Sequence, residues 1–236
     1  MSAPDRPQVL SPLGPHLVLG GSSGVYGVSE AIPAFTEDVD VLVDAEWIFR
    51  EELTVVAEMR RLGFDHQAGT PTFTSADGLS LDLVGYSRSD IVDRIGGGRQ
   101  LPVMVYGDLS RLLSLPRSTR RLASGALALS PAALAAAKLL TIRLEKGGKD
   151  KLQALLVIGE NAEDRDFGED LARLLGAFPA DRIEDAIADA QAAMLAVSTD
   201  VQVAGPQAAG YAAMHHRLET GFAALVRLAG FAEPRA

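Results

Sequence analysis

Hydrophobic and polar positions in the first half of the chain follow two different periods, which predicts a mixture of strands and helices. Residues 16–20 form a short apolar run that ends in glycine, and residues 38–44 alternate acidic with apolar side chains before becoming apolar. We expect a strand in each segment. Residues 45–62 have apolar positions at helical spacing, and Gly63 is a natural stop for that helix. These apolar positions are Trp47, Phe49, Leu53, Val56 and Met59.

Turn signals divide the rest of this half into shorter elements. Residues 25–32 have the pattern of a short helix. Residues 71–75 and 79–85 flank an Asp-Gly pair, which favours a β-hairpin that turns at this pair. Residues 101–106 form another apolar run and predict one more strand.

The pattern changes near the middle of the chain, where long segments rich in alanine and leucine begin. Ser130 followed by Pro131 is a typical helix start, and residues 132–144 are strongly helical in their spacing. A helix resumes over residues 150–158, and residues 168–232 are mainly helical in period. The second half therefore predicts a bundle of helices.

These elements predict an α/β (α+β) fold: a small mixed sheet with flanking helices, followed by a helical C-terminal domain. The expected division is an N-terminal extension over residues 1–15, an α/β core over residues 16–128 and the helical domain over residues 129–236. A change of composition, and not a linker, marks the second boundary.

Composition narrows the class of protein. The chain has 236 residues, a formal net charge of −9 and 47% hydrophobic residues, which suffices for a substantial core. It has no cysteine, which excludes disulfides, thiolate metal sites and a cysteine nucleophile and fits a cytoplasmic location. We expect neither a signal peptide nor a membrane span, because no segment has the required apolar run.

Charge is unevenly distributed along the chain. Residues 88–121 carry seven arginines against three aspartates, whereas residues 159–200 carry eleven acidic residues against three arginines. An acidic protein has no general attraction for nucleic acid. The arginine-rich segment could hold a phosphate-rich ligand locally, and the alternative interpretation is an ordinary charged surface.

The first motif that could take part in ligand binding or catalysis is Gly20-Gly21-Ser22, which follows the first expected strand. Small residues there let backbone amides approach a phosphate. The turn also resembles that of short-chain dehydrogenases, but Tyr26 interrupts the family's spacing and the chain has no Tyr-x-x-x-Lys pair. A serine hydrolase is disfavoured too, because Ser22 or Ser23 as a nucleophile would need a nearby histidine and acid.

The second motif consists of acidic residues on strands. Asp38 and Asp40 are two residues apart, so their side chains point to one face and repel each other unless a cation intervenes. Asp82 is a single acid within an apolar strand segment, where an unpaired buried carboxylate would be costly. A shared Mg²⁺ or Mn²⁺ ion would satisfy all three carboxylates. The alternative interpretation is a solvent-facing strand edge with harmless acids.

Together, the Gly-Gly-Ser turn, the Asp-x-Asp strand and the later strand aspartate resemble the polymerase-beta-like nucleotidyltransferase superfamily. The resemblance is greatest to its minimal and abortive-infection toxin-like (AbiEii-type) members and covers residues 16–158. In the second half, Lys138 followed by Lys149 and Asp150 resembles the helical segment that follows the catalytic core of such toxins. Gln153 departs from the pattern, since relatives often have an acid there.

The resemblance implies a transfer of a nucleoside monophosphate from ATP or another NTP to an acceptor hydroxyl. It implies that Asp38, Asp40 and Asp82 are the catalytic and metal-binding residues. It also implies nucleotide binding by the Gly-Gly-Ser turn and by Lys138. The metal would be Mg²⁺ or Mn²⁺. The acceptor stays open between an RNA end, a protein and a small molecule, and a cognate antitoxin-like protein is a possible partner.

Two further interpretations stay open at this point. One is a non-catalytic module of the same fold that binds a nucleotide or a partner protein. The other is a glycosyltransferase that uses Asp-x-Asp with Mn²⁺, although such a nucleotide-sugar domain normally needs a longer chain. A nucleotide-dependent rise in thermal stability without any transfer reaction would favour the first of them.

Overall fold

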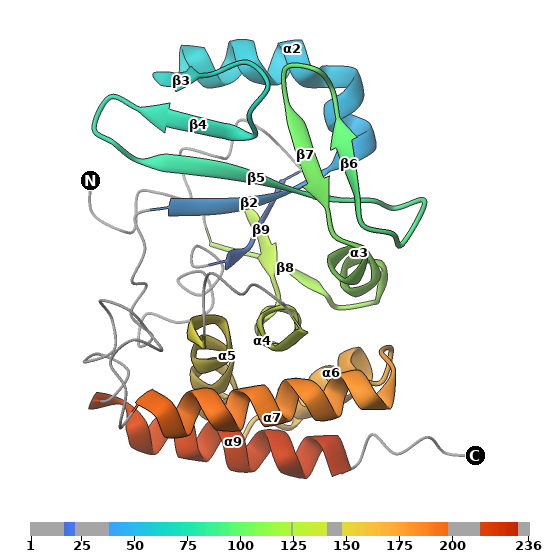
Figure 1. Cartoon of the computed structure of the whole chain (residues 1–236), viewed down its shortest axis with the longest axis vertical. Coiled ribbons are helices and arrows are strands. Elements are labelled where there is room, and N and C mark those ends of the chain that lie inside the picture. Colours follow the sequence, from blue (N-terminus) through green and yellow to red (C-terminus); the bar gives the residue numbers. More distant parts are fainter. Residues whose placement is uncertain (1–16, 22–37, 124, 141–147, 198–212, 231–236) are drawn as a thin grey trace. The chain divides into compact units, whose positions relative to one another are not determined.

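The computed structural model describes residues 17–21, 38–123, 125–140, 148–197 and 213–230. The chain forms two compact units that meet between Ser130 and Pro131 in the sequence. The unit before this point contains a sheet, and the unit after it consists of helices (Figure 1). The expected class, α/β with a mixed sheet followed by a helical region, is confirmed.

The N-terminal unit is organised around a mixed sheet of nine strands. Their main order is β3-β4-β5-β2-β1-β9-β8, and the β6–β7 hairpin joins through a parallel pairing of β7 with β5. The pairs β2–β5 and β1–β9 are also parallel, whereas β1–β2 and β4–β5 are antiparallel. The strands are β1 Leu17–Leu19, β2 Asp38–Asp44, β3 Phe64–His66, β4 Thr72–Ser75, β5 Ser80–Tyr86, β6 Arg94–Gly97, β7 Pro102–Val105, β8 Thr119–Arg121 and β9 Leu127–Leu129.

Strand β2 lies in the middle of this sheet, and its alternating apolar residues give it one buried face. Val39, Val41 and Val43 share one face and are almost completely buried, as the period of two requires. They pack in one core cluster with residues of helix α2, Ala45–Arg61 (Figure 1). The opposite face of β2 carries Asp40 together with the buried Leu42.

Helix α2 begins and ends where the sequence predicts. The Asp44 carboxylate accepts hydrogen bonds from the amides of Glu46 and Trp47, which satisfies two free N–H groups of the first turn. Gly63, at a φ of +87°, follows the last turn. Two of the apolar positions at helical spacing, Phe49 and Leu53, are 68% and 69% exposed, because the buried stripe runs elsewhere on the helix. That stripe consists of Ala45, Ile48, Val55, Val56 and Met59.

The predicted hairpin between residues 71 and 85 is confirmed. Thr74 on β4 is in register with Ser80 on β5, and Gly78 occupies the turn at a φ of +86°. The predicted strands at 38–44 and 101–106 are confirmed as β2 and β7. The expected helix over residues 25–32 lies outside the described residues.

The C-terminal unit contains five described helices, and the N-terminal unit contains α2 and the short helix α3, Gly107–Ser114. Helices α5 and α9 pack most closely, since a Cβ atom added to Gly221 would overlap the Leu155 carbonyl oxygen. In the described residues, no helix is both long and apolar enough to cross a membrane. The five helices are α4 Pro131–Leu140, α5 Lys149–Glu160, α6 Arg165–Leu175, α7 Ala180–Val197 and α9 His215–Gly230.

Candidate functional site

A row of polar groups crosses β4, β5 and β2 and continues to Gly20, the residue directly after β1. Asp40 on β2 is in register with Asp82 on β5, and Asp82 is in register with Thr72 on β4. On the other side of β2, the Gly20 amide donates a hydrogen bond of 3.1 Å to the Asp40 carbonyl oxygen. Residues in register on neighbouring strands point to the same face. The Asp40 and Asp82 carboxylates therefore lie on one face of adjacent strands.

Gly21 packs directly against the first of these carboxylates. It has a φ of +53°, and a Cβ atom there would lie 2.5 Å from the Asp40 carboxyl carbon and overlap one of its oxygens. The left-handed backbone and this contact both require glycine. Gly20 before it is buried against the Leu42 side chain. The structure thus brings Gly20, Gly21, Asp40 and Asp82 together.

Asp82 has a hydrogen-bond donor that the sequence analysis missed. The Thr72 hydroxyl donates to one Asp82 carboxylate oxygen over 2.7 Å. This bond uses one side of the carboxylate and leaves its other oxygen for a further partner. The register of the predicted hairpin is the signal that could have found Thr72, since it places residue 72 opposite residue 82.

The remaining predicted residues of the N-terminal half are only partly described. The backbone of Asp38 lies in β2 in register with Ser80, which places residue 38 on the same strand face as Asp40. Its side chain, and all of Ser22, lie outside the described residues. Within the described part of the chain, no group of three or more His, Asp or Glu side chains is placed to hold a metal ion.

Lys138, the predicted phosphate ligand, is buried in the C-terminal unit. Its ammonium group donates to an Asp150 carboxylate oxygen over 3.0 Å, and the two side chains are 7% and 14% exposed. Asp150 therefore balances the charge of Lys138. A buried pair of this kind is costly to break from one side, because the remaining charge loses its partner.

Gln153 lies one helical turn after Asp150 on α5. It is fully buried, and neither its amide nitrogen nor its amide oxygen has a hydrogen-bond partner among the described residues. A buried amide without a partner loses its hydration and gains nothing in return.

We expect Gln153→Leu to stabilise the C-terminal unit by about 1 kcal/mol, because an apolar side chain of similar size removes the unpaired amide. Urea unfolding followed by circular dichroism at 222 nm measures this change. Gln67→Leu, at an exposed position of the N-terminal unit, is the matched control and should leave stability unchanged. A loss of stability in Gln153→Leu would show that the amide makes a favourable interaction after all.

A second polar cluster joins the start of α2 to the segment after β5. One Glu46 carboxylate oxygen accepts hydrogen bonds from the Ser87 hydroxyl and from Arg94, over 2.8 and 2.6 Å. Arg94 also pairs with Asp90. Partial burial acts to raise the pKa of Glu46, but hydrogen bonds, chiefly with Ser87 and Asp44, outweigh it and lower the pKa to about 2. Arg94, one of the seven arginines of residues 88–121, therefore has a structural role in this cluster.

The pKa of Glu46 predicts an acid-dependent loss of stability. A folded pKa of about 2 against 4.5 means that the ionised group stabilises the fold above pH 4.5, and that this contribution disappears as the pH falls towards 2. Glu46→Gln should cost about 1 kcal/mol at pH 7, a small effect because the carboxylate is partly exposed, and nothing near pH 2. Urea unfolding across this pH range, followed by Trp47 fluorescence, measures the difference.

The control for this measurement is Glu58→Gln. Glu58 pairs with Arg61 on the exposed surface of the same helix, so its replacement should change stability little at any pH. A wild-type advantage over Glu46→Gln that persists unchanged at pH 2 would contradict the prediction.

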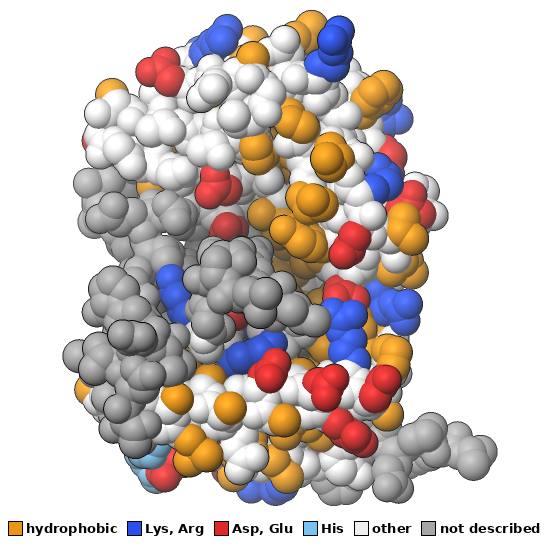
Figure 2. Space-filling model, viewed as in Figure 1, with side chains coloured by type: hydrophobic (Ala, Val, Ile, Leu, Met, Phe, Trp, Pro, Cys, Tyr) orange, Lys and Arg blue, Asp and Glu red, His pale blue; other side chains and the backbone are white. Residues whose placement is uncertain are grey.

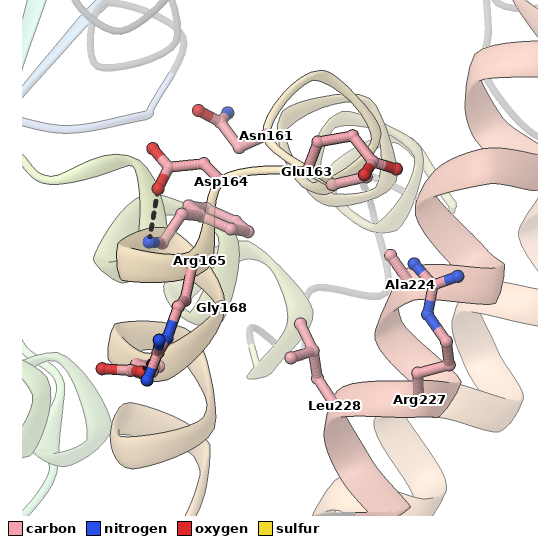
Figure 3. Close-up of a pocket in the computed structure, with 11 residues that line it drawn as sticks. Asn161, Glu163, Asp164, Arg165, Gly168, Ala224, Arg227 and Leu228 are labelled. Atoms are coloured by element: carbon pink, nitrogen blue, oxygen red, sulfur yellow. Dashed lines mark hydrogen bonds and ion pairs between the residues drawn. The ribbon is translucent and has the colours of Figure 1, made fainter.

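A pocket of about 580 Å³ lies within the C-terminal unit, between the start of α6 and the end of α9. Figure 3 shows Ala224, Arg227 and Leu228 on α9 across from Asp164, Arg165 and Gly168. The pocket is not a phosphate site by its charge, because three acidic residues line it against two arginines. The acidic residues are Glu163, Asp164 and Glu169.

Comparisons with known proteins give limited information about this chain. No family model matches it, and no curated protein matches it in sequence. Among solved structures it is similar to JHP933 from Helicobacter pylori, at 12% identity and a TM-score of 0.49, over 96% of this chain and 89% of the other. It is also similar to a "putative nucleotidyltransferase" from H. pylori, at 11% identity and a TM-score of 0.47, over 98% and 95%. At such low identity and TM-score, the activity of these proteins is not transferred to this chain.

Proposed function

We propose that the protein transfers a nucleoside monophosphate from an NTP to an acceptor hydroxyl and releases pyrophosphate. The observation that carries this proposal is the register of β2 with β5, which sets Asp40 beside Asp82 on one face. The backbone of Gly21 lies directly against the Asp40 carboxylate. A glycine turn next to paired carboxylates suits a ligand that combines phosphates with a divalent cation.

The donor set fits a magnesium ion. Asp40 and Asp82 offer carboxylate oxygens from neighbouring strands, and Asp38 occupies a position on the same strand face as Asp40. Hard oxygen ligands of this type suit Mg²⁺, which commonly binds one or two carboxylates together with substrate phosphates. When bound, the ion would neutralise charge that develops on the phosphates during transfer. Mn²⁺ would fit the same oxygen ligands.

Each residue of the row then has a specific role. Asp38 and Asp40 would hold the metal together with the triphosphate, and Asp82 would accept the proton of the attacking hydroxyl. Thr72 is a positioning residue, since its hydroxyl fixes one oxygen of Asp82. The amides of Gly20, Gly21 and Ser22 would bind the β- and γ-phosphates. Catalysis of this kind depends mainly on position and electrostatics.

Lys138 can contribute to phosphate binding only in competition with Asp150. The pair between these two residues is buried, so a phosphate would have to replace the carboxylate as the partner of the ammonium group. We retain Lys138 as a proposed nucleotide ligand on the resemblance described above. The acceptor stays open between an RNA end, a protein hydroxyl and a small molecule, and an antitoxin-like partner stays a prediction.

The test is thermal stability in the presence of each NTP, with and without Mg²⁺. At least one NTP should raise the melting temperature of the wild type only when Mg²⁺ is present, because ligand that binds the folded state stabilises it. Asp40→Asn should lose this shift. The matched control is Asp65→Asn, an exposed aspartate on β3 of the same unit, which should keep it.

Two other results would contradict the proposal. If no NTP shifts the wild type, the paired carboxylates do not form a metal–nucleotide site. If Asp40→Asn keeps the full shift, the nucleotide binds elsewhere. A shift without transfer to any acceptor would favour the non-catalytic binding module.

A further inference from the structure

The strand order of the N-terminal sheet places the two ends of the proposed transfer reaction on opposite sides of β2. Gly20 and Gly21 follow β1, Asp40 lies on β2, and Asp82 lies on β5. The inference rests on the proposed function, in which the glycine turn holds the β- and γ-phosphates and Asp82 takes the proton of the attacking hydroxyl. The attacking and leaving oxygens lie on opposite sides of the phosphorus during phosphoryl transfer. The acceptor must therefore approach over β5 and the two strands beyond it, β4 and β3.

The sheet face over these three strands is polar and open to solvent. Ser80 on β5 is in register with Thr74 on β4, and Thr74 is in register with Asp65 on β3. Asp82 and Thr72 form the next row on the same face. Thr74 and Asp65 are exposed. The alternate residues point to the other face and are buried in the core: Phe64, Phe73 and Leu81.

The charge of this face disfavours a nucleic acid as the acceptor. Residues 62–87, which include all three strands, contain Asp65, Asp77 and Asp82 but no Lys or Arg. Figure 2 shows acidic side chains near β2 and β5 on the visible face of the N-terminal unit, and no Lys or Arg side chain over β4 and β5. An RNA end carries phosphates close to its terminal hydroxyl, and proteins hold such phosphates with basic side chains. Here the carboxylates would repel them.

The same face has no apolar anchor for a protein acceptor. Among the described residues, none of the exposed large apolar side chains belongs to residues 62–87. The buried centre of a protein interface is usually apolar. The hydroxyls of Thr74 and Ser80 and the carboxylate of Asp65 offer hydrogen-bond partners for hydroxyl and ammonium groups instead.

The width of this face limits the size of the acceptor. Asp82 and Asp65 lie two strands and two residues apart, which corresponds to about 12 Å from the usual spacings in a sheet. A hydroxyl bound at Asp82 and an ammonium group bound at Asp65 would each take about 3 Å of this distance. A single six-membered ring with these groups on opposite sides fills the remainder.

We propose that the acceptor is a small polyhydroxylated amine, bound over β5, β4 and β3 with an ammonium group at Asp65. Its attacking hydroxyl gives its proton to Asp82, and its oxygen forms a bond to the α-phosphorus of the NTP. The bond between this phosphorus and the pyrophosphate oxygen breaks, and pyrophosphate leaves towards the glycine turn. Thr74 and Ser80 hydrogen-bond the remaining ring hydroxyls. Asp65 thus selects the acceptor and takes no part in nucleotide binding.

The experiment measures label transfer by the full chain from an α-phosphate-labelled NTP with Mg²⁺ to acceptors that differ in charge. The probes are streptamine, which is a ring with amine and hydroxyl groups, the uncharged scyllo-inositol, an inositol monophosphate, and a short RNA with a free 3′ hydroxyl. The NTP is one that raises the melting temperature of the wild type. Transfer should be fastest to streptamine, slower to scyllo-inositol, and absent for the inositol phosphate and the RNA.

Substitutions at residue 65 test the position of the acceptor. Asp65→Lys should raise the KM for streptamine by about tenfold and Asp65→Asn by about threefold, because the attraction for the ammonium group is reversed or lost. Both variants should keep the NTP-dependent rise in melting temperature, which also shows that they fold. Glu58→Lys is the matched control: it makes the same change of charge on α2, which packs on the opposite face of the sheet, and should keep the wild-type KM.

Failure of this inference can be distinguished from failure of the proposed function. If no NTP raises the melting temperature of the wild type, the nucleotide site itself is refuted. If an NTP does so but the label moves to RNA, to the inositol phosphate, to protein or to none of the probes, the acceptor inference is overturned and the nucleotide site stands. An unchanged KM for streptamine in Asp65→Lys would also overturn it, since the ammonium group would then lie elsewhere.

Discussion

Gly21→Ala is expected to destabilise the N-terminal unit by about 3 kcal/mol. Two effects add at this position. A φ of +53° is strained for alanine, and the new methyl group would overlap the Asp40 carboxylate. Relief of the overlap requires the carboxylate to move away from its place beside Asp82. Any nucleotide-dependent rise in melting temperature should therefore be lost together with the stability.

The measurement is urea unfolding followed by tryptophan fluorescence. Trp47 is the one tryptophan of the sequence and lies in α2 against the core of the N-terminal unit, so its emission reports on that unit. Gly78→Ala is the matched control: Gly78 has a φ of +86°, but no atom lies within 4 Å of the added methyl group. It should cost about 1 kcal/mol, from backbone strain alone.

Equal losses in the two glycine variants would contradict the prediction. They would mean that only the backbone conformation matters at Gly21 and that the Asp40 carboxylate moves aside without cost. A Gly21→Ala protein that keeps the nucleotide-dependent shift would further mean that the turn does not position Asp40.

The central strands of the sheet could be predicted because their local pattern and their burial agree. The alternation in residues 38–44 reflects β2 directly, with valines on the core face and Asp40 on the other. The hairpin register also follows from the turn at Gly78, which places Thr72 opposite Asp82. The register of β2 with β5 was not predictable, since parallel pairing depends on contacts between distant segments.

The edge strands could not be predicted because tertiary pairing, and not local preference, forms them. Strand β6 reads Arg-Ile-Gly-Gly and β8 reads Thr-Arg-Arg, and neither has an alternating apolar pattern. β6 becomes a strand by pairing with β7, where Val103 and Val105 are completely buried. Residue preferences in strands are known to depend on such context.

The helical half shows the limit of reading charge from sequence. The resemblance implies that Lys138 binds nucleotide, and the charge pattern alone does not show that Lys138 and Lys151 are both buried within the unit. Burial lowers the pKa of Lys151, whose ammonium donates to the Leu139 carbonyl. A helical segment with alternating basic and apolar residues does not reveal which basic residue faces inward. Packing against the neighbouring helices decides it.

Gly221→Ala is expected to destabilise the C-terminal unit by about 3 kcal/mol, because it removes the closest helix crossing in that unit. The added methyl group would lie 2.8 Å from the Leu155 carbonyl carbon, overlap its oxygen and lie 3.1 Å from the Gly159 amide nitrogen. These are backbone atoms of α5, so no side chain can rotate away. Helix α9 must move, and the apolar contacts of Leu218 and Leu225 with the core weaken.

The matched control is Gly168→Ala, a glycine inside helix α6 whose added methyl group would make an ordinary 3.4 Å contact with Leu228. It should be neutral or stabilise by about 0.5 kcal/mol, since alanine is the better helix former. Circular dichroism at 222 nm should show the loss in Gly221→Ala, and Trp47 fluorescence should report an unchanged N-terminal unit. Similar stability of the two variants would mean that α9 does not pack on α5 at this distance. An equal loss of stability measured by circular dichroism and by Trp47 fluorescence would mean that the two units unfold together.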